Sequence, residues 1–259
     1  MTGEQEPAVT ARNTDGVVVV AMNRAARRNT LAADLYTALA DLLEDLQYDA
    51  NARAVVLTGG AHFCAGGDLG DLDAPALHTR RAMVHGQRIV RALVQGRLPV
   101  VAAVEGAAFG AGFSLAMACD FIVAEAKSSF CAAFGRVGLM PDYGLGWTLP
   151  QKIGLGAARE VLMLSETLSG TAAHDLGIVD LLAPEGAVLE VATERARRLA
   201  GAAEGAISAT KSLLGRAPLS LDAALSWEAD TQTLLIGSQD FREGIAAFRE
   251  RRHPRFKGV

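Results

Sequence analysis

Cysteine is scarce in this chain, and its few copies exclude two common kinds of site. The three cysteines, Cys64, Cys119 and Cys131, are an odd number and lie far apart among small apolar neighbours, so no disulfide framework is expected. No Cys-x-x-Cys motif occurs, and no two of the five histidines stand four residues apart around a glutamate, as they do in a helical zinc motif. We therefore predict neither a disulfide nor a metal.

Excess positive charge and long apolar runs are also missing. The formal net charge is −4, so the chain has no broad basic surface of the kind that nucleic-acid-binding proteins use to neutralise phosphates. No uncharged apolar stretch reaches the roughly 18 residues needed to cross a bilayer, and the N-terminus lacks a cationic start followed by an apolar run. We expect no nucleic-acid partner, no membrane span and a cytoplasmic location.

The hydrophobic half of the 259 residues is enough for one main core. Apolar runs typical of buried strands occur at residues 17–21, 54–58, 100–104 and 121–124. Leucines at helical spacing follow the first run, with Thr30 as their expected N-cap, and further helical patterns cover residues 83–93 and 113–119. Strands that alternate with helices predict an α/β fold.

The C-terminal quarter has a different pattern. From about residue 188 the strand signal disappears, and helical patterns with charged faces take over. We therefore divide the chain into an α/β core with the ligand site, residues 1–187, and a helical region, residues 188–259. An apolar stripe in this region either packs on its own core or serves subunit assembly; it consists of Leu221, Leu225, Trp227 and Leu234.

Two glycine-rich turns are the candidates for a ligand site. Residues 63–69 and 106–112 each follow a buried strand, and their small side chains would let a ligand approach the backbone closely. The second turn leads into a helix whose first amides have no intrahelical partner. Two main-chain N–H groups aimed at one oxygen stabilise an oxyanion. Taken singly, each turn could also be no more than a tight structural corner.

Two other kinds of site fit these turns poorly. Gly110-x-Gly112 could begin a dinucleotide-binding fingerprint, but the position of the third glycine holds Leu115 and the turn lies mid-chain. No Gly-x-Ser-x-Gly elbow occurs, so a serine hydrolase of that kind is not expected.

Several motifs follow one another along the chain: FCAGGDL at 63–69, VAAVEGAAFGAG at 101–112, LAMACD at 115–120, GLMPD at 138–142, GIVD at 177–180 and HPRFKG at 253–258. In this order the chain resembles the enoyl-CoA hydratase/isomerase (crotonase) family over nearly its whole length. The resemblance implies a spiral of ββα units and a helical C-terminal region used in homotrimers or homohexamers. It also implies that an acyl-coenzyme A thioester is the substrate, with no further cofactor.

The resemblance also assigns roles to the two turns. By position, the oxyanion-hole amides would be those of Ala65 and Ala111. The neighbouring residues Cys64, Gly66, Gly67 and Gly110 would line the thioester. Asp68 would mostly support its own loop, consistent with the way aspartates bond nearby turn amides.

Hydratases of the family use two glutamates, and both are replaced here. The matching positions hold Ser114 and Phe134. Ser114 can at most hold a water molecule, and Phe134 makes that part of the pocket drier.

Asp142 is the one carboxylate left in a suitable place. It follows Pro141, and family isomerases related to phenylacetate degradation carry a similar Pro-Asp-x-Gly, in which the aspartate shuttles a proton. Burial against Phe134, Leu139 and Trp147 would raise its pKa to a useful value. We expect a Δ3 to Δ2 enoyl-CoA isomerase or a related ring or double-bond isomerase.

Other functions stay open. One is a divergent hydratase that uses Asp142 with a Ser114-bound water, and another is an acyl-CoA binding protein without catalysis. Asp142 could also be only a turn residue. Aryl-CoA dehalogenases of the family carry a nucleophilic aspartate at this position, but aromatic residues make up only 5% of the chain, too few for an aromatic cradle.

The phosphates of coenzyme A need cations. Arg27, with Arg24 and Arg28 beside it, follows the first predicted strand, where the family's coenzyme contacts begin. Lys257 could reach the nucleotide of its own or a neighbouring subunit. Each of these residues could equally be a solvated surface charge.

Overall fold

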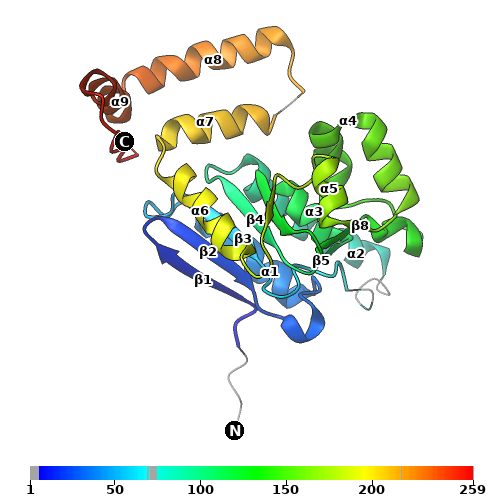
Figure 1. Ribbon diagram of the computed structural model, residues 1–259. Coiled ribbons are helices and arrows are strands. Elements are labelled where there is room, and N and C mark those ends of the chain that lie inside the picture. Colours follow the sequence, from blue (N-terminus) through cyan, green and yellow to red (C-terminus); the bar gives the residue numbers. More distant parts are fainter. Residues whose placement is uncertain (1–5, 69, 71–74, 217, 259) are drawn as a thin grey trace.

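The computed structural model describes residues 6–68, 70, 75–216 and 218–258, which form two sheets with covering helices (Figure 1). The larger sheet has six strands in the order β1-β2-β3-β4-β6-β9. Their bounds are β1 (Val9–Thr14), β2 (Val17–Met22), β3 (Ala54–Thr58), β4 (Val100–Val104), β6 (Phe121–Glu125) and β9 (Leu181–Ala183). β1 and β2 form an antiparallel hairpin, and the remaining neighbours pair in parallel. The smaller sheet joins β5 (Ala107–Phe109), β7 (Ser129–Cys131) and β8 (Leu168–Ser169).

The four strands predicted from apolar runs are confirmed as β2, β3, β4 and β6. Their side chains alternate between two cores because successive residues of a strand point to opposite faces. Val55 and Leu57 of β3 face the larger core, whereas Ala54 and Val56 face the smaller one. Helices therefore cover both faces of the sheet, which explains why these strands are apolar throughout rather than alternating with polar residues.

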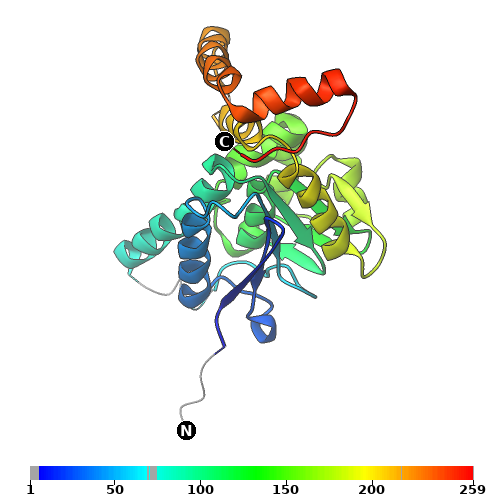
Figure 2. The same ribbon diagram turned by 90° about the vertical axis from the view of Figure 1, so that its left-hand side faces the viewer.

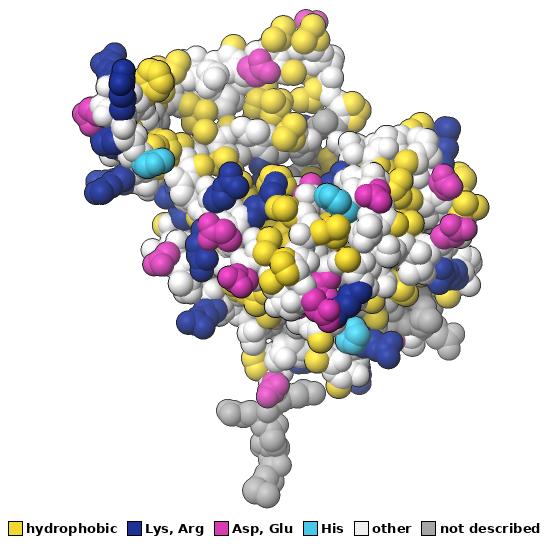
Figure 3. Space-filling model, viewed as in Figure 1, with side chains coloured by type: hydrophobic (Ala, Val, Ile, Leu, Met, Phe, Trp, Pro, Cys, Tyr) yellow, Lys and Arg dark blue, Asp and Glu magenta, His cyan; other side chains and the backbone are white. Residues whose placement is uncertain are grey.

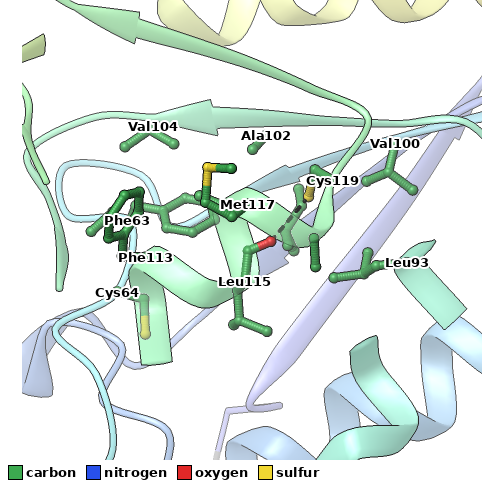
Figure 4. Close-up of a cluster of buried hydrophobic side chains, with 14 of the residues drawn as sticks. Phe63, Cys64, Leu93, Val100, Ala102, Val104, Phe113, Leu115, Met117 and Cys119 are labelled. Atoms are coloured by element: carbon green, nitrogen blue, oxygen red, sulfur yellow. Dashed lines mark hydrogen bonds between the residues drawn. The ribbon is translucent and has the colours of Figure 1, made fainter. Parts of the chain in front are cut away.

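The larger core lies under five helices. They are α1 (Ala33–Asp45), α2 (Ala76–Gln95), α3 (Ala111–Ala118), α4 (Leu145–Leu164) and α5 (Gly170–Asp175). Figure 4 shows part of this core, with Phe63, Phe113 and Leu115 among its apolar side chains. The opposite face carries α6 (Val188–Ala200), which packs small side chains on β3 and β4.

Two predicted helix boundaries need correction. α1 begins at Ala33 with Ala32 as its N-cap, whereas the Thr30 hydroxyl donates to the Arg27 carbonyl oxygen at 2.7 Å. Thr30 therefore closes the short 3-10 helix η1 (Ala25–Arg27) instead of capping α1. α2 covers residues 76–95 and so extends beyond the predicted 83–93 at both ends.

The C-terminal region is helical, as its pattern indicated. α7 (Glu204–Leu214), α8 (Leu221–Ile236) and α9 (Gln239–Glu250) follow α6. α6 lies on the sheet and α7 is attached beside it through Lys211, whereas both views show α8 and α9 projecting from the body (Figures 1 and 2). Among the helices of the described chain, none combines the length and the apolar character that crossing a membrane would require.

Candidate active site

The two glycine-rich turns lie side by side. The Phe63 amide donates to the Glu105 carbonyl oxygen at 2.9 Å, and the Cys64 amide donates to that of Ala107 at 3.0 Å. In return the Phe109 amide donates to the Cys64 carbonyl oxygen at 3.0 Å. The first turn is therefore joined to β5 by an isolated parallel bridge between Cys64 and Ala108.

Glycine is required where the turns touch. A Cβ atom on Gly112 would lie 2.3 Å from the carbonyl oxygen of Cys64, closer than any side chain can approach backbone. Gly66 has a φ of +108°, and a Cβ there would lie 2.9 Å from the carbonyl oxygen of Phe109 and 3.8 Å from the amide nitrogen of Ala111. The backbones of the two turns are thus in direct contact.

The amide of Ala111 has the properties of an oxyanion-hole donor. Ala111 is the first residue of α3, so its N–H has no partner within the helix, and it donates no hydrogen bond to any other residue that the structure describes. Being at the helix N-terminus, it carries part of the positive end of the helix dipole.

The second donor predicted from the sequence, Ala65, must be corrected. Its amide donates to the carbonyl oxygen of Arg28 at 3.0 Å, so it is already engaged in holding the loop. The amide of Gly67 donates no hydrogen bond among the described residues, and a Cβ on Gly67 would meet no atom within 4 Å. Gly67 is exposed as well. Gly67 and Ala111 therefore each offer a free amide close to the contact at Gly66.

Asn29 holds the first turn in place, and sequence reasoning missed it. Its side chain is fully buried, and its amide group donates to the carbonyl oxygens of Gly59 and His62 at 2.9 and 2.7 Å. Its backbone carbonyl accepts the Cys64 thiol at 3.0 Å. An asparagine with a φ of +52° shortly after a strand is a weak signal for such a role, because asparagine tolerates left-handed backbone.

Asp68 also supports its loop, since its carboxylate accepts the amide of Gly70 at 2.9 Å. The thiols of all three cysteines are buried and free, and burial raises the pKa of Cys64 to about 12, so that it is no nucleophile. Within the described chain, His, Cys, Asp and Glu side chains form no cluster of three that could bind a metal ion.

The two positions that hold glutamates in hydratases of the family hold Ser114, whose hydroxyl is already hydrogen-bonded, and the apolar Phe134. Ser114 is fully buried in α3, and its hydroxyl donates to the carbonyl oxygen of Gly110 at 3.3 Å, one turn earlier. Phe134 belongs to the 3-10 helix η3 (Ala133–Val137) and is only 6% exposed. Neither position offers a carboxylate.

Asp142 stands in the turn between η3 and α4. Burial raises the pKa of its carboxyl to about 6, partly offset by a hydrogen bond from its own backbone. Its Oδ1 atom is buried, and no residue of the described chain donates to it. Leu139 and Trp147, which we expected to enclose it, keep 46% and 40% of their own surface exposed.

The cations proposed for coenzyme A lie far apart in one chain. Arg24 is held by Asp34 at 2.7 Å, whereas the side chains of Arg27 and Arg28 are exposed. Lys257 is exposed near the C-terminus, which lies beside α9 on the side of the molecule away from β5 and β8 (Figure 1).

Comparison with known proteins agrees with this geometry. The family model of enoyl-CoA hydratase/isomerase matches residues 12–259. The chain is 34% identical over 251 residues to the 1,2-epoxyphenylacetyl-CoA isomerase of Escherichia coli, covering 94% of this chain and 95% of that protein. It is 33% identical over 244 residues to the 2,3-dehydroadipyl-CoA hydratase of the same organism, covering 93% and 95%.

Solved structures show the same fold. An enoyl-CoA hydratase from Polaromonas sp. JS666 superposes with a TM-score of 0.90 at 34% identity, over 96% of this chain and 99% of that one. An enoyl-CoA hydratase from Bacillus anthracis reaches 0.93 at 30% identity, over 97% and 100%. The fold and these relatives define the class, which is that of enzymes acting on acyl-coenzyme A thioesters. The chain belongs to the enoyl-CoA hydratase/isomerase family, with the crotonase fold.

Proposed function

We propose that the protein is an enoyl-CoA double-bond isomerase in which Asp142 transfers the proton. One observation carries this proposal: Asp142 is a partly buried carboxyl with an unpartnered oxygen and a pKa of about 6. A general base with such a pKa is ionised at neutral pH and still accepts a proton readily.

The reaction needs one base and two amides. The Asp142 carboxylate removes a proton from C2 of a 3-enoyl thioester, and the electron pair of the C–H bond passes toward the thioester oxygen. The amides of Gly67 and Ala111 donate hydrogen bonds to the resulting dienolate oxygen. The Asp142 carboxylic acid then returns the proton to C4, the double bond forms between C2 and C3, and the carboxylate is regenerated.

The burial of Ser114 favours isomerisation over hydration. A hydratase must orient and deprotonate a water molecule, but the Ser114 hydroxyl is cut off from solvent and bonded to Gly110. Phe134 adds apolar surface at the other glutamate position. Excluding water also protects the dienolate until C4 receives its proton.

Turnover of a 3-enoyl-CoA tests the proposal. We expect the conjugated 2-enoyl absorbance to appear with the wild-type protein, and the rate constant kcat to fall about 10²–10⁴-fold in Asp142→Asn, because general-base catalysis contributes that much. Asp45→Asn, at an exposed position of α1, is the matched control and should keep full activity. Full activity of Asp142→Asn would refute the assignment. Hydration of crotonyl-CoA would instead indicate a hydratase, and tight binding without turnover an inactive acyl-CoA binder.

We also propose that the chain assembles into a homotrimer or homohexamer through its C-terminal helices. No residue of α8 is buried, although the helix carries several large apolar side chains. Such side chains gather over the upper helices in Figure 3, where the space-filling view shows them open to solvent. Assembly would cover them and would let Lys257 of one copy approach the nucleotide bound to another.

A further inference from the structure

Tyr143, directly after Asp142, has a rare backbone conformation. Its φ is +46°, in the left-handed region that residues with a side chain seldom adopt, and Gly144 follows at +78°. Two such residues in succession reverse the chain between η3 and α4. A strained conformation of this kind persists only where the surrounding structure holds it.

The contact that stabilises this conformation of Tyr143 is made with α2. Its position 86 is a glycine, although glycine is unfavourable in a helix interior. A Cβ atom on Gly86 would lie 2.3 Å from the Tyr143 hydroxyl and 2.8 Å from its Cζ atom. The phenol ring therefore fills the notch that the missing side chain leaves in α2. One helical turn further, a Cβ on Gly144 would lie 3.2 Å from a methyl carbon of Val90, so the turn contacts α2 at two successive levels.

Tyr143 is partly buried and packs against the larger core. Burial raises the pKa of its phenol, and the charges of Asp142, Tyr36 and Cys64 raise it further. Tyr36 belongs to α1, and Cys64 lies in the turn that carries Gly67. The ring thus packs on α2 and against the larger core, against which Tyr36 of α1 also packs.

The titratable side chains of α2 beside Gly86, those of His85 and Arg88, contact α1. The His85 ring packs against Tyr36 with 5.7 Å between ring centroids, and Arg88 donates to Glu44 and Asp41 of α1 at 2.8 Å each. No charged side chain of the described residues contributes to the pKa shift of Asp142, whose causes are burial and its own backbone. The environment of Asp142 is therefore set by packing.

We propose that Tyr143 is a positioning residue: by filling the notch at Gly86, its ring fixes the turn so that the Asp142 carboxyl stays buried at the acyl group. This inference rests on the proposed role of Asp142 as the proton-transferring base. It concerns the geometry of the turn, and the phenol itself takes no part in proton transfer.

Two variants break the contact from opposite sides. Tyr143→Gly removes the ring and tolerates the left-handed backbone, whereas Gly86→Ala fills the notch and improves the helix propensity of α2. Gly156→Ala in α4 is the matched control for the second variant, because a Cβ there would meet no atom within 4 Å. Tyr143→Phe keeps the ring and tests the hydroxyl alone.

The first measurement is the pKa of Asp142, followed by ¹³C NMR of the labelled carboxyl groups and assigned with Asp142→Asn. We expect about 6 in the wild type, in Gly156→Ala and in Tyr143→Phe. In Tyr143→Gly and Gly86→Ala it should fall by at least about one unit, toward the ordinary aspartate value near 3.9, because the carboxyl becomes solvated. This readout does not depend on turnover.

The second measurement is the kinetics with a 3-enoyl-CoA. Displacing a catalytic group should lower kcat on the order of 10–100-fold in the two variants. KM should stay within about threefold, because the amides of Gly67 and Ala111 are untouched. An unchanged Asp142 pKa in both folded variants overturns the inference. If the pKa shifts but Asp142→Asn is fully active, the positioning contact stands and the proposed function fails.

Discussion

At the scale of single residues, Asp142 should show a conflict between stability and catalysis. Its pKa of about 6 in the folded protein lies above the unfolded value near 3.9. Folding therefore favours the protonated form. The stability that this group contributes is fully present below about pH 4 and is lost as the pH rises through about 6. Ionised Asp142 then costs roughly 1–3 kcal/mol at neutral pH, at a rate of about 1.4 kcal/mol per pKa unit.

This predicts that Asp142→Asn stabilises the fold while it removes activity. The free energy of unfolding, measured with urea, should rise by about 1–3 kcal/mol at neutral pH and differ little from the wild type near pH 4. The kcat/KM of the wild type should rise with pH through the same region, since the ionised carboxyl is the base. A stability gain that is equal at both pH values would show that burial of the charge is not its cause.

The sequence indicated which residues belong to the candidate site better than it indicated their hydrogen-bond partners. The raised pKa of Asp142 follows from an acidic residue among apolar neighbours, which the sequence displays. The choice between the amides of Ala65 and Gly67 does not, because it depends on the carbonyl of Arg28, which lies 37 residues earlier in the chain and meets the loop only in the folded state. Asn29 was missed for the same reason, since its partners Gly59 and His62 are distant in sequence.

At the scale of elements, the periodicity of apolar residues identified most strands and helices. Their ends were harder to predict, because side-chain hydrogen bonds compete with helix capping there. The continuous apolar runs of β3 and β4 predicted strands because a sheet covered on both faces needs no polar side. The start of α1 was misplaced because Thr30 bonds to η1 instead, an alternative that helix propensity does not reveal. The sequence showed α6 as helical, but its position on the sheet depends on small side chains such as Ala192 and Ala196.

One buried ion pair attaches α7 to the sheet, and its removal should loosen the C-terminal helices. The Lys211 ammonium donates to Asp120 at 2.6 Å and to the Leu98 carbonyl oxygen at 2.7 Å, with only 4% of the side chain exposed. Lys211→Met leaves both acceptors without this donor. We expect a loss of about 2–4 kcal/mol in unfolding free energy, slightly below the range for fully buried pairs because Asp120 is partly exposed.

Hydrogen exchange would locate this effect. In Lys211→Met, the amides of α7 to α9 should lose protection, while those of β3 and β4 keep it. Replacing the solvent-exposed Lys127, which pairs with Glu185 and Glu125, provides the matched control and should leave the protection of α7 to α9 unchanged. Equal effects of the two lysine substitutions would mean that Lys211 does not anchor α7.

At the scale of the whole molecule, the projecting helices expose large apolar side chains that the proposed assembly would cover. Leu221, Leu225, Leu234 and Ile236 of α8 are between 51% and 77% exposed, and Phe248 of α9 is 83% exposed. Exposed apolar surface gathered in one region marks an interface rather than scattered surface residues. The buried anchor at Lys211 keeps this surface in a fixed position relative to the sheet, as a specific assembly requires.

Charge placed on α8 should therefore separate the subunits. We expect the wild type to sediment as a trimer or hexamer and Leu225→Glu/Leu234→Glu to sediment as a monomer, because the buried interface would then hold unpaired carboxylates. Tyr48→Glu, at a residue 90% exposed just after α1, should leave the assembly intact. If Lys257 reaches the nucleotide of another copy, the monomeric variant should bind acyl-CoA more weakly and lose much of the salt dependence of its KM, since the phosphates would lose a cation. A wild type that sediments as a monomer would contradict the assembly, and a monomeric variant with unchanged affinity would remove Lys257 from the site.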